Sequence, residues 1–98
     1  MSELRFEWDR KKEQLNKRKH GISFVEAENV FADDFAILIE DPDHSDQEER
    51  FVLLGLSASL RILIVSHTYR KDDGLIRIIS ARKATPKERE AYNPRRQK

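Results

Sequence analysis

The chain of 98 residues contains no cysteine, which excludes disulfide bonds, thiolate metal sites and a cysteine nucleophile. Its three glycines form no glycine-rich phosphate loop, and neither a G-x-S-x-G nor an H-E-x-x-H motif occurs. No apolar run approaches the roughly 18 residues that a membrane span needs. We therefore expect one soluble, cytoplasmic domain over residues 1–98, without a membrane partner.

The net charge of +1 hides two separate patches of opposite sign. The segment from Arg10 to His20 holds six bases and one acid, Glu13, whereas the segment from Glu40 to Glu49 holds six acids and no base. A basic segment of this kind attracts phosphate at long range. A solvated helix face is the commoner explanation of a single charge run, so both interpretations stay open.

Local signals predict two helices in the first third of the chain. Asp9 stands where an N-cap belongs, ahead of a helix from Arg10 to about Lys19 that closes at Gly21 in the left-handed conformation. A capping box, Ser23 with Glu26 three residues later, predicts a second helix with an apolar face.

The rest of the chain reads as strands followed by one helix. Four strands are expected, at 35–39, 50–56, 60–69 and 75–82, besides a short one at 4–8. Because the connections between the last strands are short, they should form an antiparallel meander. A second capping box at Thr85-Pro86-Lys87-Glu88 predicts a helix through Tyr92, ended by Pro94, with residues 95–98 as a frayed tail.

Two arginines, Arg77 and Arg82, lie in the last of these strands. Guanidinium groups are almost never left unpaired inside a protein, so each of them should meet an anion. That anion is either a carboxylate of this chain, such as one between Glu40 and Glu49, or the phosphate of a nucleic acid.

A hairpin that pairs Tyr69 with Leu75 would set His67 opposite Arg77. An imidazole transfers protons near neutral pH and a guanidinium stabilises a developing phosphorane, so this pair suggests catalysis. A surface cluster, in which His67 only packs and Arg77 pairs with an acid, is the commoner outcome. Strict alternation turns Arg82 to the other face of the sheet unless it lies beyond the end of the strand.

Five blocks of the sequence, in order, resemble the signature of a known family, the BrnT toxins: Phe6-Glu7-Trp8-Asp9, Lys19-His20-Gly21-Ile22-Ser23-Phe24, Glu40-Asp41-Pro42-Asp43-His44-Ser45, Glu49-Arg50-Phe51, and Arg77-Ile78-Ile79-Ser80-Ala81-Arg82-Lys83-Ala84. The resemblance runs from Phe6 to Tyr92. It implies a compact α+β domain similar to RelE toxins, with a meander of about four strands, two N-terminal helices and one C-terminal helix. It also implies an endoribonuclease that inhibits translation, and a BrnA-like antitoxin whose ribbon-helix-helix portion binds DNA, so that DNA is contacted only through the antitoxin.

The matching blocks and the strand argument together give candidate residues for RNA cleavage. Such a reaction needs no metal or other cofactor, because the 2′-OH of RNA is the internal nucleophile. The expected catalytic residues are His67, Arg77, Arg82 and Arg50. The expected RNA-binding residues are Lys19, His20, Arg70, His44 and Tyr69.

Two other functions remain open at this point. A non-catalytic module could bind nucleic acid or protein through its basic face and act as a co-repressor with its partner. A metal-dependent nuclease could use His44 and the acids around it, although their spacing matches no known ligand loop and a hydrogen-bonded turn is favoured.

Overall fold

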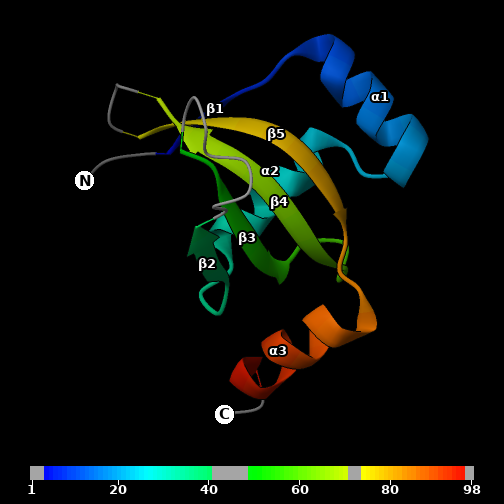
Figure 1. The fold of residues 1–98 in the computed structure, drawn as a ribbon, viewed down its shortest axis with the longest axis vertical. Helices are drawn as coiled ribbons and strands as arrows, with labels where there is room; N and C mark the ends of the chain where they lie inside the picture. The colour runs from blue at the N-terminus through cyan, green and yellow to red at the C-terminus, as the bar shows by residue number, and fades with distance from the viewer. Residues whose placement is uncertain (1–3, 41–48, 71–73, 97–98) are drawn as a thin grey trace.

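The computed structural model describes residues 4–40, 49–70 and 74–96, the last four of these by their backbone alone. The N-terminal elements are strand β1 (Arg5–Glu7), helices α1 (Arg10–His20) and α2 (Phe24–Asn29), and the 3-10 helix η1 (Val30–Ala32). They are followed by β2 (Ile37–Glu40), β3 (Phe51–Leu56), β4 (Ile62–Tyr69), β5 (Leu75–Lys83) and helix α3 (Pro86–Arg96). Figure 1 places α1 and α3 at opposite ends of the molecule.

The strands form one five-stranded sheet in the order β1-β5-β4-β3-β2. The antiparallel pairs β2–β3, β3–β4 and β4–β5 confirm the predicted meander. The expectation of about four strands was incomplete, because β1 adds to β5 as a parallel fifth strand and makes the sheet mixed. The sequence pattern at 4–8 predicts a strand but not which strand it pairs with. Its partner is about 70 residues away in the sequence, and only tertiary packing brings the two together.

The first two helices begin where the sequence predicts. The Asp9 carboxylate accepts a hydrogen bond from the Lys11 amide at 2.8 Å, and Gly21 ends α1 with a φ of 72°. The Ser23 hydroxyl accepts from the Glu26 amide at 3.0 Å. The Glu26 carboxylate does not return to Ser23; it binds Arg61, which lowers the pKa of Glu26. Only one of the two hydrogen bonds of the predicted capping box, from the Glu26 amide to the Ser23 hydroxyl, is therefore formed.

Helix α3 has the complete capping box. The Thr85 amide donates to the Glu88 carboxylate at 2.8 Å, and the Glu88 amide donates to the Thr85 hydroxyl at 3.2 Å. The helix does not end at Pro94 as predicted, and instead runs to Arg96. A proline in the last turn removes only one intrahelical hydrogen bond, which the helix tolerates at its end. Residues 97–98 of the expected tail lie outside the described part.

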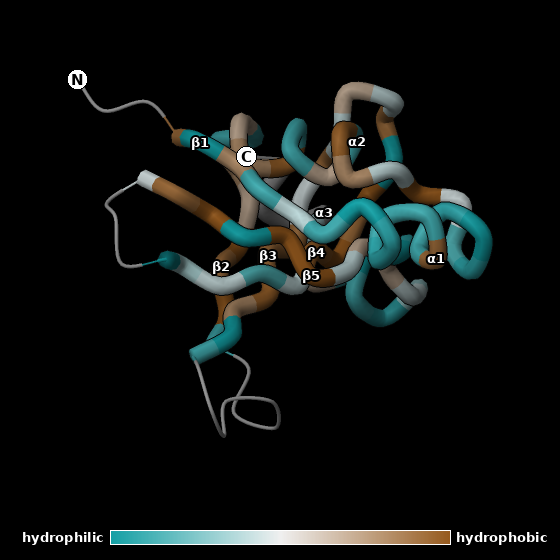
Figure 2. Tube along the Cα trace, turned by 90° about the horizontal axis from the view of Figure 1, so that it is seen from above, coloured by the Kyte–Doolittle hydropathy of each residue, from teal (hydrophilic) through white to brown (hydrophobic). Residues whose placement is uncertain are grey.

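The sheet has an apolar cluster on each face, but the two clusters differ in extent. The larger one lies under α2 and η1 and consists of Ile22, Phe24, Ala27, Val30, Leu53, Leu63, Val65, Ile78 and Ala81. We call this side the inner face. On the outer face, α3 covers a smaller cluster of Leu54, Ile64, Ala84 and Tyr92. Figure 2 shows hydrophobic strands in the middle of the molecule and an almost entirely hydrophilic α1.

Helix α1 is attached to β5 through one buried amide, the side chain of Asn16. This side chain donates to the carbonyl oxygens of Ile22 and Ala81 at 2.9 and 2.8 Å, and accepts from the Ala81 amide at 3.1 Å. The β1–β5 ladder extends only to Arg77, so Asn16 bonds the backbone of β5 beyond the end of β1. A polar side chain thus stands in for a missing strand partner.

Candidate functional site: an arginine-lined hollow on the outer face

A β-bulge in β5 decides which side chains share a face. Ser66 pairs with Ser80 and His67 pairs with Ile78, so Ile79 is an extra residue. As a result Arg77 pairs with Thr68 and Arg82 with Ile64, two residues that lie on the same side of β4. Arg77 and Arg82 therefore share the outer face although Arg82 lies within the strand, contrary to the prediction from strict alternation.

The outer face is hollowed beside Arg82. The hollow has a volume of about 260 Å³ and is lined by Arg50, Val52, Ile64, Ser66, Ile79, Ser80 and Arg82. We call it the arginine hollow. Two arginines and two serines in this lining offer hydrogen-bond donors and positive charge, the combination that binds a phosphate. The serines were not among the sequence candidates, because a serine in a strand carries no signal of its own.

In this structure a carboxylate of the chain binds Arg82. The two terminal nitrogens of Arg82 donate to the two oxygens of Glu88 at 2.9 and 3.0 Å. The Arg82 guanidinium is the main cause that lowers the pKa of Glu88, to about 2. The side chains are 41% and 32% exposed, so the pair is accessible to solvent and to a competing anion. The sequence expectation placed the partner between Glu40 and Glu49; α3 supplies it instead.

Arg77 is likewise bound to a carboxylate of the chain. Its guanidinium donates to Glu7 at 3.1 Å, and the Nε of Arg70 lies 3.2 Å from the same oxygen. The structure thus brings together Arg70 and Arg77, two of the predicted site residues, through an acid of β1. Arg77 lies on the outer face but does not line the arginine hollow.

The predicted contact between His67 and Arg77 is wrong. His67 pairs with Ile78, one residue away from the expected register, and therefore faces the inner side. Its side chain is fully buried between Phe31, Phe51 and Tyr69, and burial lowers the pKa of the imidazole. The cause is the hairpin, in which Tyr69 pairs with Ile76 and not with Leu75, a difference of one residue that loop length alone does not reveal.

The hydrogen bonds of His67 fix its tautomer. Nδ1 lies 3.1 Å from the Val65 carbonyl oxygen, which can only accept, so Nδ1 carries the proton. In the neutral ring Nε2 then accepts from the Tyr69 hydroxyl, 3.4 Å away. Tyr69 is 46% exposed, so a proton can reach His67 through it. The catalytic role of His67 stays a prediction.

The remaining predicted contacts do not line the arginine hollow. Lys19 is exposed near the end of α1, and His20, the last residue of that helix, is half-buried. His44 falls outside the described residues, together with most of the acidic segment that a metal-dependent nuclease could use. Within 4–40, 49–70 and 74–96, no group of three or more His, Asp or Glu side chains is placed to hold a metal ion.

No helix in these ranges is long and apolar enough to cross a membrane.

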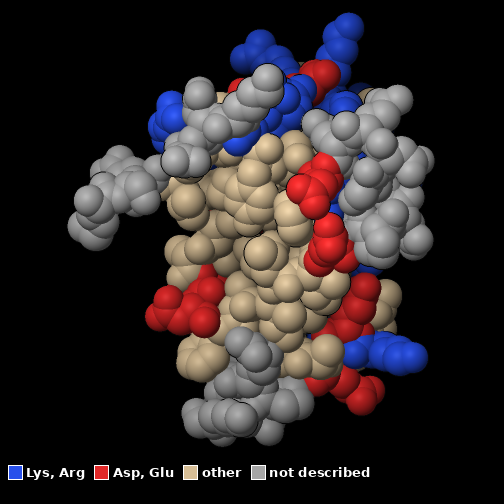
Figure 3. All heavy atoms as spheres, turned by 60° about the vertical axis from the view of Figure 1, so that its left-hand side comes forward, with Lys and Arg blue, Asp and Glu red and all other residues tan. Residues whose placement is uncertain are grey.

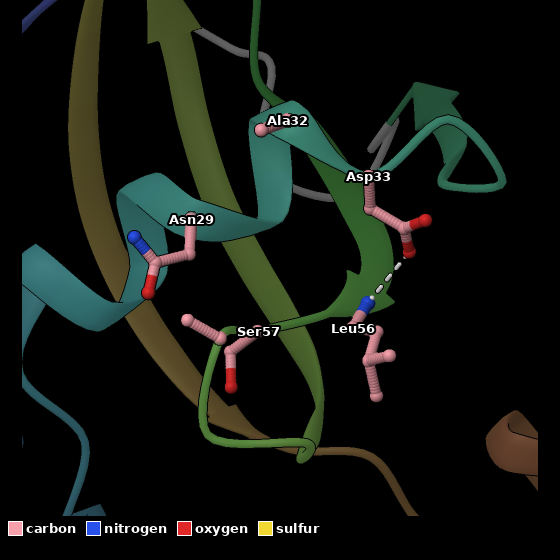
Figure 4. A pocket seen from close by; sticks show the side chains of 6 residues that line it. Asn29, Ala32, Asp33, Leu56 and Ser57 are labelled. Carbon is pink, nitrogen blue, oxygen red and sulfur yellow. Dashed lines mark hydrogen bonds between the residues drawn. The ribbon is translucent and has the colours of Figure 1, made fainter.

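A larger hollow, of about 350 Å³, lies between η1 and the end of β3 (Figure 4). Its carboxylate, Asp33, accepts hydrogen bonds from the Leu56 amide at 2.8 Å and from the Tyr92 hydroxyl. Asp33 therefore links η1, β3 and α3 through these hydrogen bonds, and we interpret its role as structural. The arginine hollow is the better candidate for a functional site.

Comparison with known proteins identifies the family. A family model described as the ribonuclease toxin BrnT of type II toxin-antitoxin systems matches residues 8–88. The chain belongs to the BrnT family. A similar solved structure is the ribonuclease toxin BrnT of Brucella abortus, with a TM-score of 0.61, 25% sequence identity, and coverage of 84% of this chain and 97% of that chain. The comparison with curated protein sequences gives no match.

Membership of the BrnT family confirms the resemblance carried by the five sequence blocks. The range matched by the family model contains the whole arginine hollow and Glu88, whereas Glu7 lies outside it. A toxin of a type II system acts together with an antitoxin, so membership also implies an antitoxin partner.

Proposed function

We propose that this BrnT-family protein is a metal-independent endoribonuclease that binds the scissile phosphate of RNA in the arginine hollow. The observation that carries this proposal is that Arg50 and Arg82 line one hollow together with Ser66 and Ser80. Arginine forks suit phosphate oxygens, and hydroxyl donors suit a phosphorane that accumulates negative charge.

The reaction uses a nucleophile that RNA itself provides. The 2′-oxygen attacks phosphorus and gives its proton to solvent water, the bond from phosphorus to the 5′-oxygen breaks, and that oxygen takes a proton from water, so that no net proton is gained or lost. The products are a 2′,3′-cyclic phosphate and a 5′-hydroxyl. No oxidant or metal enters the balance. In the proposal, the arginines stabilise the pentacovalent phosphorane, an effect worth about 2 to 4 kcal/mol for one well-placed donor.

Arg82 is bound to Glu88, so phosphate must compete for it. The pair is partly exposed, and an exposed ion pair is worth about 1 kcal/mol or less. A phosphate that binds Arg82 and Arg50 together can exceed that value. We propose that Glu88 moves away from the Arg82 fork when RNA binds, while Lys19, His20 and Arg70 contact the RNA backbone outside the hollow.

The same proposal includes the effect of the protein on translation and its neutralisation by an antitoxin. Cleavage of RNA by the free toxin would inhibit translation, in a manner similar to RelE toxins, and a BrnA-like antitoxin with a ribbon-helix-helix portion would neutralise it and bind DNA. An antitoxin that masks the basic groups should associate faster at low salt, since opposite charges mainly raise the association rate.

The proposal is tested by incubating the purified protein with RNA in excess chelator, next to the same sequence with 2′-O-methyl groups. We expect cleavage of the RNA alone, with 2′,3′-cyclic phosphate ends. Intact RNA in chelator, with cleavage restored by magnesium, would contradict the metal-free reaction.

A non-catalytic role has one observation in its favour: both Arg77 and Arg82 already bind carboxylates of the chain. Under that reading the protein acts as a co-repressor with its partner. Binding of RNA without cleavage under all metal conditions, together with unimpaired growth on induction, would establish it in place of the nuclease.

A further inference from the structure

The outermost strand, β2, exposes large apolar side chains at the edge of the sheet. It is the last strand in the sheet order, with β3 as its neighbour on one side. Leu38 and Ile39 are 51% and 50% exposed, and Phe35, just before the strand, is 38% exposed. Edge strands are the places where a sheet can accept a further strand, and most proteins protect them with charges or a bulge. Apolar residues in this position indicate an interaction surface.

The apolar side chains occupy both faces of the edge. Leu38 pairs with Leu53, a residue of the inner cluster, whereas Ile39 pairs with Val52 and lines a hollow beside α3 on the outer face. A helix packed on one face would cover only one of the two. An extended strand added beside β2 can cover both, because its own side chains alternate between the faces and its backbone bonds the edge.

Acidic side chains flank this apolar segment. Asp34 precedes it and Glu40 ends it, and both are exposed. Figure 3 shows uncharged surface down the centre of one face of the molecule, with acidic side chains on both sides of it. A complementary strand would therefore carry apolar residues at consecutive positions in its middle, so that they lie on both faces, and Lys or Arg toward its ends.

We propose that β2 is the docking edge for an extended segment of the antitoxin, which adds to the sheet as a sixth strand. The inference rests on the proposed function only for the identity of the partner. It differs from masking of basic groups, because the docked strand would itself be basic at its ends. The strand would lie beside β2, at the far edge of the sheet from β1, where the hollow that Ile39 lines adjoins Arg82.

The test measures the affinity of the protein for the product of the neighbouring reading frame by calorimetry. Leu38→Lys and Ile39→Lys place a charge at the edge, and Val25→Lys, at an exposed valine of α2 outside the basic helix α1, is the matched control. We expect each edge variant to bind at least about tenfold more weakly, because a charge in an apolar interface is costly, and the control to bind as the wild type does. Wild-type affinity of both edge variants, or absence of binding by the wild type itself, would overturn the proposal.

Two further measurements keep the result interpretable. RNA cleavage by the free Leu38→Lys variant should equal that of the wild type, since Leu38 lies on the inner face, away from Arg82. This shows that the variant is folded and keeps the proposed function separate from docking. Hydrogen exchange on the wild-type complex should show protection of the Ile37–Glu40 amides. Unchanged exchange there would overturn the proposal even if the variants unfold. A wild type that dimerises alone through β2 would identify a second copy as the occupant and also overturn it.

Discussion

Replacement of Glu88 by Gln should strengthen RNA binding while it weakens the fold. In the structure, Glu88 binds both terminal nitrogens of Arg82, so it competes with any phosphate for that guanidinium. The Gln side chain keeps the shape and loses the charge. Few substitutions next to a binding site are expected to raise affinity, which makes this outcome specific to the proposed competition.

The size of the effect follows from the ion pair. The pKa of Glu88 falls from 4.5 to about 2, chiefly through the Arg82 hydrogen bonds, which would correspond to about 3 kcal/mol without screening. The pair is 41% and 32% exposed, so we reduce this to about 1 kcal/mol. An RNA affinity about fivefold tighter, and a free energy of unfolding lower by a similar amount, are therefore expected.

The assay is fluorescence anisotropy with a 2′-O-methyl RNA, which binds and is not cleaved. Glu90→Gln, the same charge change at an exposed position of the same helix, is the control for net charge. Equal affinities of the Glu88→Gln and Glu90→Gln variants would refute the idea that Glu88 occupies a phosphate position.

Three predictions concern stability. Asn16→Ala should lower the free energy of unfolding by about 3 kcal/mol, because buried backbone groups lose their partner; urea denaturation beside the exposed control Gln14→Ala measures this. Because the pKa of Glu88 is lowered on folding, its contribution of about 1 kcal/mol to the free energy of unfolding is present above pH 4.5 and is lost as the pH falls toward about 2. Glu88→Gln should abolish that part of the acid dependence, and thermal melting at a series of pH values would show it. Gly55→Ala should destabilise the protein by about 1 to 3 kcal/mol, because the new Cβ would lie 2.8 Å from Val30 Cγ1, and an unchanged melting temperature would contradict that packing.

Signals that act within a few residues predicted the helices well. Asp9, Gly21 and the box at Thr85 and Glu88 act within four residues of themselves, so they appear as expected in the structure. Glu26 shows the limit of such reasoning: Arg61, which is 35 residues away, binds its carboxylate in place of Ser23.

The arrangement of the site depended on features that the sequence does not display. The register of the β4–β5 hairpin, in which Tyr69 pairs with Ile76 and not with Leu75, moved His67 to the opposite face from Arg77. One inserted residue, Ile79, then returned Arg82 to the face of Arg77. Alternation cannot anticipate a bulge, because any residue can occupy the extra position. The arginines were recognised from their burial cost, but the acid that binds Arg82 came from a helix rather than from the acidic segment.

The most direct test of the account is the RNA cleavage rate of Arg82→Ala, measured in a single turnover with enzyme in excess and chelator present. Lys87→Ala, an exposed base on α3, is the matched control. We expect the Arg82 variant to cleave about 10² to 10³ times more slowly than the wild type, with a melting temperature lower by only a few degrees because its ion pair is partly exposed. Cleavage at the wild-type rate by a folded Arg82→Ala variant would contradict the assignment of the arginine hollow as the site of RNA cleavage.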